Sequence, residues 1–147
     1  MLCYLNSEMK MSLINHIFRR GFSTTTPLNE LQLLSRVKVV DNSKIGRNAK
    51  QSGRPVRIIH VYNKTHVGRL GDKVLLTIEH EKKKGYIVGC KQNQGPFVPK
   101  FDSNNVVLVD DDGQPLGTRI RAPIPSCLRA DTDPNFVKVL SLATTFV

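Results

Sequence analysis

Residues 72–80 read DKVLLTIEH, and this stretch decides the fold class. Val74, Leu76 and Ile78 fall at every second position, and Thr77 lies on the opposite face. Successive side chains of a strand point to opposite faces, so the alternation predicts a half-buried strand. One face of this strand should enter a core, and the other should meet solvent or a partner.

Four further β-rich runs lie on either side of this strand. They are residues 37–41 (VKVVD), 55–62 (PVRIIHVY), 86–91 (YIVGCK) and 105–109 (NVVLV). Gly89 predicts a bulge or a barrel bend, and Asp-Asp-Gly at 111–113 predicts a tight turn. Closing five short strands into a barrel would remove their exposed edges. We therefore predict a mainly β fold, a small five-stranded β-barrel with a C-terminal loop and short helices.

The C-terminal stretch has a different pattern. Pro115, Pro123 and Pro125 argue against a central strand and predict a stiff extended loop. Asp133 followed by Pro134 is a good helix start, and the apolar residues at 136, 139, 140 and 143 follow at helical spacing. A short amphipathic helix should pack on the barrel.

The net charge of +10, from 22 basic and 12 acidic side chains, indicates a polyanionic partner, with nucleic acid as the first candidate. The alternative is a solvated basic surface. A loop over residues 43–54, expected to be mobile, and a charged turn over 82–85 hold many of the cations. The candidate RNA-binding residues are Lys44, Arg47, Lys50, Arg54, Lys64, Arg69, Lys82, Lys83, Lys84, Arg119 and Arg121.

The aromatic side chains argue against base-sequence reading. Tyr62, Tyr86, Phe97 and Phe101 are too few and too scattered for a platform on which single-stranded bases stack. Contact with backbone phosphates and with the shape of folded RNA is the better expectation.

The sequence has no constellation typical of an enzyme. The histidines at 60, 66 and 80 lack metal-ligand spacing, and no glycine-rich phosphate loop or nucleophile motif is present. Cys3, Cys90 and Cys127 are widely separated, and we expect Cys90 and Cys127 to be reduced packing residues. No catalytic residue, metal or cofactor is expected.

Residues 9–26 (MKMSLINHIFRRGFSTTT) are basic and hydroxyl-rich, contain no acid and form an amphipathic pattern, as mitochondrial transit peptides do. The alternative is a disordered basic arm. We therefore divide the chain into residues 1–26, a transit peptide or disordered extension, and residues 27–147, the barrel domain. No apolar run approaches the roughly 20 residues that cross a membrane.

Several motifs resemble those of the universal large-subunit ribosomal protein family fourteen. They are residues 37–43 (VKVVDNS), 68–79 (GRLGDKVLLTIE), 101–125 (FDSNNVVLVDDDGQPLGTRIRAPIP) and 136–143 (FVKVLSLA). They occur in the family's order, and the N-terminal extension fits its mitochondrial form. Between residues 91 and 101 the family usually has a strongly basic hairpin, but here Lys91 and Lys100 are the only charges.

The resemblance implies a structural constituent of the mitochondrial large ribosomal subunit, located in the matrix. Its implied partners are large-subunit rRNA, a neighbouring large-subunit ribosomal protein, small-subunit rRNA through an intersubunit bridge, and a ribosomal silencing factor. The resemblance places residues 117–120 in an RNA-facing loop. The alternative hypothesis is a free RNA-binding barrel protein of the mitochondrial matrix.

Overall fold

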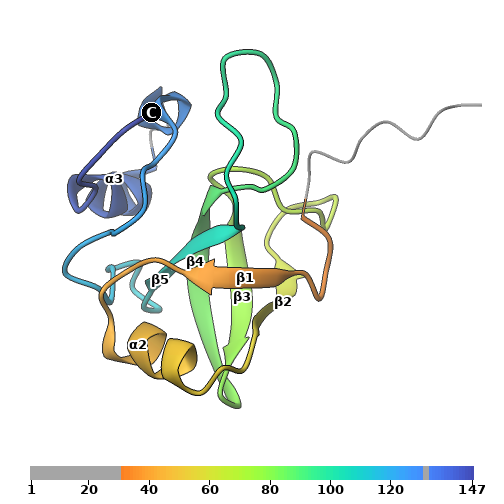
Figure 1. Cartoon of the computed structure of the whole chain (residues 1–147), viewed down its shortest axis with the longest axis vertical. Helices are drawn as coiled ribbons and strands as arrows, with labels where there is room; N and C mark the ends of the chain where they lie inside the picture. The colour runs from red at the N-terminus through yellow and green to blue at the C-terminus, as the bar shows by residue number, and fades with distance from the viewer. Residues whose placement is uncertain (1–30, 131–132) are drawn as a thin grey trace, which may run out of the picture.

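The computed structural model describes residues 31–130 and 133–147, and it contains the predicted barrel (Figure 1). The strands are β1 (Arg36–Val39), β2 (Val56–Val61), β3 (Lys73–Ile78), β4 (Glu81–Gly89) and β5 (Asn105–Val109). The transit peptide predicted within residues 1–26 lies outside the described residues. Among the described helices, none is long and apolar enough to cross a membrane.

The barrel closes between its first and last strands. β1 pairs antiparallel with β2 and parallel with β5, where Lys38 faces Asn105 in the register, and all other neighbouring strands are antiparallel. The register shifts between Ile87 and Gly89, which confirms the irregularity predicted at Gly89. The five-stranded closed barrel predicted from the sequence is therefore confirmed.

Alternate residues of the strands fill the barrel interior. Val74, Leu76 and Ile78 of β3 are buried there, as their spacing predicted. Ile58 of β2 and Leu108 of β5 are fully buried in the same cluster. The alternation along β3 thus places its apolar face in the core.

A second core lies between the sheet and the C-terminal segment. The 3-10 helix η1 (Ser126–Ala130) and the α-helix α3 (Pro134–Ser141) contribute to it, and Figure 1 shows α3 beside the barrel. The Phe136 ring is 5.2 Å from the ring of Tyr86 on β4. The predicted C-terminal helix is confirmed, although the Asp133 side chain makes no capping hydrogen bond.

Two local predictions were wrong. Within residues 43–54, predicted as a mobile loop, the chain forms the helix α2 (Lys44–Gln51). Lys82, Lys83 and Lys84, predicted in a turn, belong to β4, and the turn before it is formed by residues 79 and 80. Gly85 suggested a turn, but it is a strand residue whose added Cβ would lie 2.7 Å from the Val107 carbonyl oxygen.

Candidate nucleic-acid interface

The helix α2 forms because its N-terminus is capped and because the residues on its buried face, Gly46 and Ala49, are small. The Gly46 N–H donates to Ser43 Oγ at 3.0 Å, which satisfies one of the free donors of the first turn. A Cβ added at Gly46 would lie 2.7 Å from Val39 Cγ1, so glycine lets the helix approach β1 closely. Lys50 in the last turn complements the helix dipole. These features turn a polar segment into a rigid support for its cations.

Asp41 lies buried below this helix. Ser43 Oγ donates to Asp41 Oδ1 at 2.8 Å. Among the described residues, no donor lies within hydrogen-bonding geometry of Asp41 Oδ2. Burial raises the pKa of the Asp41 carboxyl, and the hydrogen bonds from Ser43 oppose that rise. Asp41 is only 6% exposed, so its carboxyl reaches little of the surface above it.

Several predicted cations meet over β1 and α2. Arg47 and Lys50 of α2 and Arg121 of the C-terminal loop line one surface hollow together with Lys38 of β1. Arg121 Nη2 donates to Asn42 Oδ1 at 2.7 Å, which holds the guanidinium near the hollow. Lys38 also lines a neighbouring hollow with Arg36.

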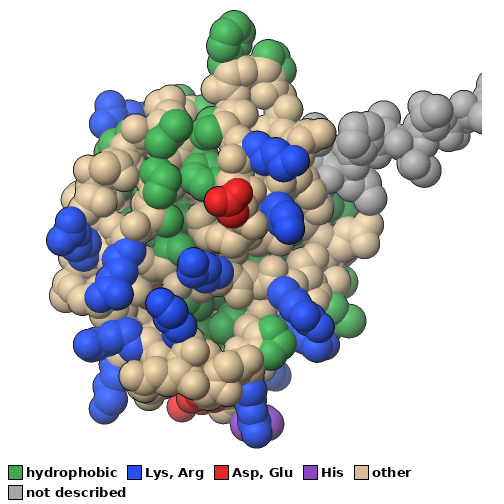
Figure 2. All heavy atoms as spheres, in the orientation of Figure 1, with side chains coloured by type: hydrophobic (Ala, Val, Ile, Leu, Met, Phe, Trp, Pro, Cys, Tyr) green, Lys and Arg blue, Asp and Glu red, His purple; other side chains and the backbone are tan. Residues whose placement is uncertain are grey.

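We call Arg36, Lys38, Arg47, Lys50 and Arg121 the basic face, and all five side chains are exposed. Figure 2 shows Lys and Arg side chains spread over the surface that carries β1 and α2, with few acidic side chains among them. Asp41 is the one acidic residue among those that line the hollows described here. This surface is built to attract polyanions.

The sequence reasoning missed Arg36 and Lys38. Both belong to the segment RVKV of β1, whose buried Val37 alternates with the two exposed cations. The same alternation that predicted β3 could have found them, because the polar positions of a half-buried strand face outward.

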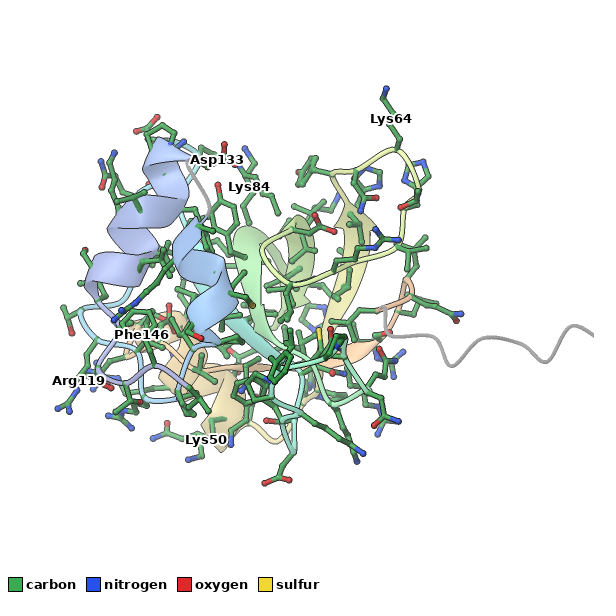
Figure 3. The ribbon with its side chains drawn as sticks, turned by 90° about the horizontal axis from the view of Figure 1, so that it is seen from above. Lys50, Lys64, Lys84, Arg119, Asp133 and Phe146 are labelled. Carbon is green, nitrogen blue, oxygen red and sulfur yellow. The ribbon has the colours of Figure 1, made fainter. Side chains whose placement is uncertain are left out.

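Other predicted residues lie elsewhere. Figure 3 shows Lys64 and Lys84 on the opposite side of the molecule from Lys50 and Arg119. Lys84 Nζ is 2.6 Å from Asp111 Oδ1, and this contact raises the pKa of Lys84 and lowers the pKa of Asp111. Lys82 is exposed and Lys83 half-buried on the same strand. The predicted residues thus do not form one continuous site.

The remaining four predicted residues lie at separate places on the surface. Lys44 is exposed at the first position of α2, and Arg69 is exposed in the connection between β2 and β3. Arg119 is exposed in the C-terminal loop, where its carbonyl accepts from the Asn42 N–H at 3.0 Å. Arg54 Nη1 lies 2.8 Å from His80 Nε2, so its guanidinium is already engaged beside β2.

The comparisons with known proteins identify the family. A family model of ribosomal protein L14p/L23e matches residues 30–147, which include every described strand and helix. The chain belongs to this L14p/L23e family. It is 50% identical over 129 residues to a protein of Danio rerio named large ribosomal subunit protein uL14m. That alignment covers 88% of this chain and 89% of the relative. The resemblance noted in the sequence is confirmed.

The L14p/L23e barrel also carries a projecting loop over residues 91–101. Figure 1 shows the segment between β4 and β5 extending from the end of the barrel opposite α2. Phe97 is fully exposed in this loop, and its φ is +62°. Phe101 N–H donates to the Cys90 carbonyl at 3.1 Å and closes the base of the loop.

The reactive side chains form no catalytic arrangement in the described part of this L14p/L23e chain. There, no group of three or more His, Cys, Asp or Glu residues could hold a metal ion. Burial raises the pKa of Cys90 to about 11, so this thiol stays protonated at neutral pH. Cys90 is a packing residue as predicted, but Cys127 is exposed, which corrects its prediction.

Proposed function

We propose that the chain is a structural constituent of the mitochondrial large ribosomal subunit and binds large-subunit rRNA through the basic face. The observation that carries the proposal is the convergence of Arg47, Lys50 and Arg121 with Lys38 around one hollow. Cations held on regular elements can neutralise phosphates and release counterions with little loss of side-chain freedom.

The family and the relative support the ribosomal part of the proposal. The L14p/L23e model describes ribosomal proteins, and the Danio rerio relative is named as a protein of the large ribosomal subunit. A structural role, with no catalysis, agrees with this family. The chain is not an enzyme.

The mitochondrial part rests on the first segment and on the relative's name. Residues 9–26 have transit-peptide composition, and the "m" of uL14m is the mark of the mitochondrial form. Import would place the mature chain in the matrix, within the mitochondrial ribosome. Residues 27–147 would then form the ribosomal domain.

Further partners follow from the family resemblance. They are a neighbouring large-subunit ribosomal protein, small-subunit rRNA through an intersubunit bridge, and a ribosomal silencing factor. Arg119 and Arg121 are exposed on the C-terminal loop, which supports the proposal that they contact rRNA. Lys64, Arg69 and Lys82 stay proposed RNA contacts outside the basic face.

Sedimentation tests the assignment. The tagged full chain should migrate with the large subunit in a gradient of mitochondrial lysate, whereas a pool at the top of the gradient would favour the free RNA-binding protein. Replacing Arg119→Ala and Arg121→Ala together should lower incorporation into the subunit while the barrel stays folded by circular dichroism. Lys100→Ala with Lys138→Ala is the matched control for lost charge, because both side chains are exposed and neither is a proposed RNA contact. Normal incorporation of the Arg119/Arg121 variant would remove this loop from the principal RNA contacts.

A further inference from the structure

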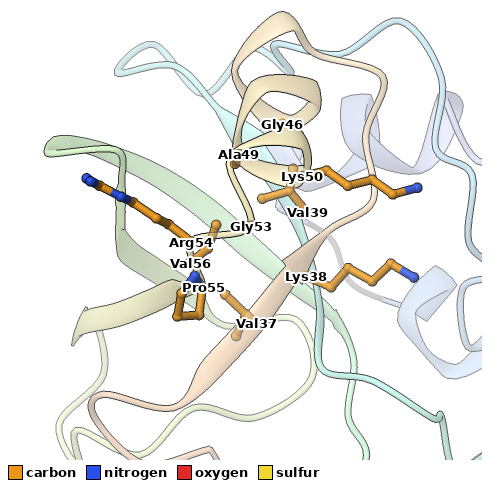
Figure 4. Close-up of a pocket in the computed structure, with 10 residues that line it drawn as sticks. All are labelled: Val37, Lys38, Val39, Gly46, Ala49, Lys50, Gly53, Arg54, Pro55 and Val56. Atoms are coloured by element: carbon orange, nitrogen blue, oxygen red, sulfur yellow. The ribbon is translucent and has the colours of Figure 1, made fainter.

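Two surface hollows flank the contact between α2 and β1. The first has a volume of about 220 Å³ and apolar walls formed by Val37, Ala49, Pro55 and Val56 (Figure 4). Arg54 also lines it, but Figure 4 shows that side chain pointing away from the valines. The first hollow is therefore an apolar recess at the edge of a cationic surface.

The second hollow is cationic. It has a volume of about 190 Å³ and contains Arg47 and Arg121 in its wall. Lys38 and Lys50 line both hollows, and Figure 4 shows their side chains extending in the same direction, roughly side by side. The two ammonium groups thus mark the boundary between an apolar recess and a cationic one.

The volumes of the two hollows and the charges around them indicate which kind of ligand fits. Sites for drug-sized ligands usually measure about 300–1,000 Å³, so each hollow suits a smaller unit such as one base with its sugar. A nucleotide combines a flat, largely apolar base with a phosphate, and successive nucleotides repeat that charge along the chain. The two hollows have the same order: the apolar recess comes first, then Lys38 and Lys50, and then Arg47 and Arg121.

We propose that these hollows hold one unpaired nucleotide of large-subunit rRNA. Its base or ribose lies over the first hollow against the exposed Pro55, its phosphate lies between Lys38 and Lys50, and the next phosphate lies on Arg47 and Arg121. The inference rests on the proposed rRNA binding and adds to it a specific recess for an unstacked nucleotide. A base-paired nucleotide would not enter the first hollow, because its base is held in the helical stack.

An acidic peptide is the competing occupant. It could place carboxylates on the cations and an apolar side chain in the recess. The observations favour RNA because the family is ribosomal and because the cations continue beyond the two hollows to Arg36.

The test measures binding of the full chain to a transcript of mitochondrial large-subunit rRNA over a range of salt concentrations. Lys38→Gln with Lys50→Gln should reduce the slope of log K against log salt by about 0.7, since the two lysines share one phosphate and each phosphate contact on a single strand contributes about 0.7. Lys100→Gln with Lys138→Gln removes the same charge from two exposed positions outside the basic face and should leave the salt slope nearly unchanged.

A second variant fills the recess without changing charge. Pro55→Phe should weaken binding roughly tenfold, comparable with the loss of one base contact, and should leave the salt slope unchanged. Pro55→Ala keeps the recess open and is the matched control. If Pro55→Phe fails to fold by circular dichroism, the lysine pair alone decides.

The outcomes separate this inference from the proposed function. A wild-type chain that does not bind the transcript would overturn both. Wild-type binding that neither the lysine pair nor Pro55→Phe weakens would overturn the nucleotide recess and leave rRNA binding intact. Displacement of the rRNA by polyglutamate at equal charge concentration would assign the hollows to an acidic peptide.

Discussion

The basic face and the loop of residues 91–101 differ in how the chain supports them. The basic face stands on β1, on the capped helix α2 and on the C-terminal loop. The Arg121 N–H of that loop donates at 2.9 Å to the carbonyl of Val40, the residue that follows β1. The loop has neither helix nor strand, and its most prominent side chain is the exposed Phe97.

This difference in support indicates that rRNA contact should be stronger on the basic face than on the loop. Side chains on regular, packed elements lose less freedom on binding than side chains on an irregular loop. The basic face also carries five cations around neighbouring hollows. Lys91 and Lys100 are the only charges of the loop, and Lys91, at its base, lines the hollow that contains Arg36 and Lys38. We therefore expect the electrostatic contact with rRNA to lie on the basic face.

The largest expected effect tests how tightly α2 packs against β1. Gly46→Ala should lower the free energy of unfolding by about 1–3 kcal/mol, because its Cβ would meet Val39 at 2.7 Å and a packed site must shift. Gly95→Ala in the loop has no atom within 4 Å of the new Cβ, so its change should stay within about 0.5 kcal/mol. Urea unfolding monitored by circular dichroism measures both. Equal effects would show that α2 is not tightly seated.

A smaller effect compares single charges. Arg47→Gln should reduce the salt slope of rRNA binding by up to about 0.7, because Arg47 shares one proposed phosphate contact with Arg121. Lys100→Gln, at the end of the neutral loop, should leave that slope unchanged. Filter binding of the full chain to the rRNA transcript measures both variants. A larger loss with Lys100→Gln would move the main contact from the basic face to the loop.

The smallest effect concerns the buried acid beneath the basic face. Because burial raises the pKa of Asp41, ionising it costs the folded state more than the unfolded state. Relative to Asp41→Asn, the wild-type free energy of unfolding should therefore fall as the pH rises from 3.8 through the raised pKa. Below pH 3.8, where both states are protonated, the difference should no longer change with pH.

Asp111→Asn should show the opposite dependence of stability on pH. Lys84 lowers the pKa of Asp111, so the wild type should gain stability relative to this variant above the ordinary pKa and lose it as the pH falls. That gain should be slight, because the Asp111 side chain is exposed. Urea titrations at a series of pH values measure both differences. A pH-independent Asp41→Asn difference would contradict the buried-acid account.

The sequence predicted the barrel and α3 because their signals are local. Alternation marks β3, and Asp133 with Pro134 marks the start of α3. The helix α2 was missed because it is short and mostly polar, and the spacing of Ile45 and Ala49 behind the capping Ser43 was its main signal. Most α-helical stability in proteins comes from packing, and the packing of Gly46 on β1 is not visible in the sequence.

The candidate site was predicted in part. Arg47, Lys50 and Arg121 were named, but their meeting around one hollow depends on the pairing of residues far apart in the chain. Lys38 was missed because its cation is a single polar position within a strand. Lys84 was placed in a turn because Gly85 resembles a turn residue, although packing against β5 requires glycine there.

Ultraviolet crosslinking within purified mitochondrial large subunits tests the central claim most directly. Mass spectrometry of the crosslinked peptides would locate the contact with rRNA. The account predicts nucleotide adducts on peptides from residues 36–56 and 119–122, which contain the basic face. Adducts confined to residues 91–101, or the absence of the chain from the subunits, would contradict it.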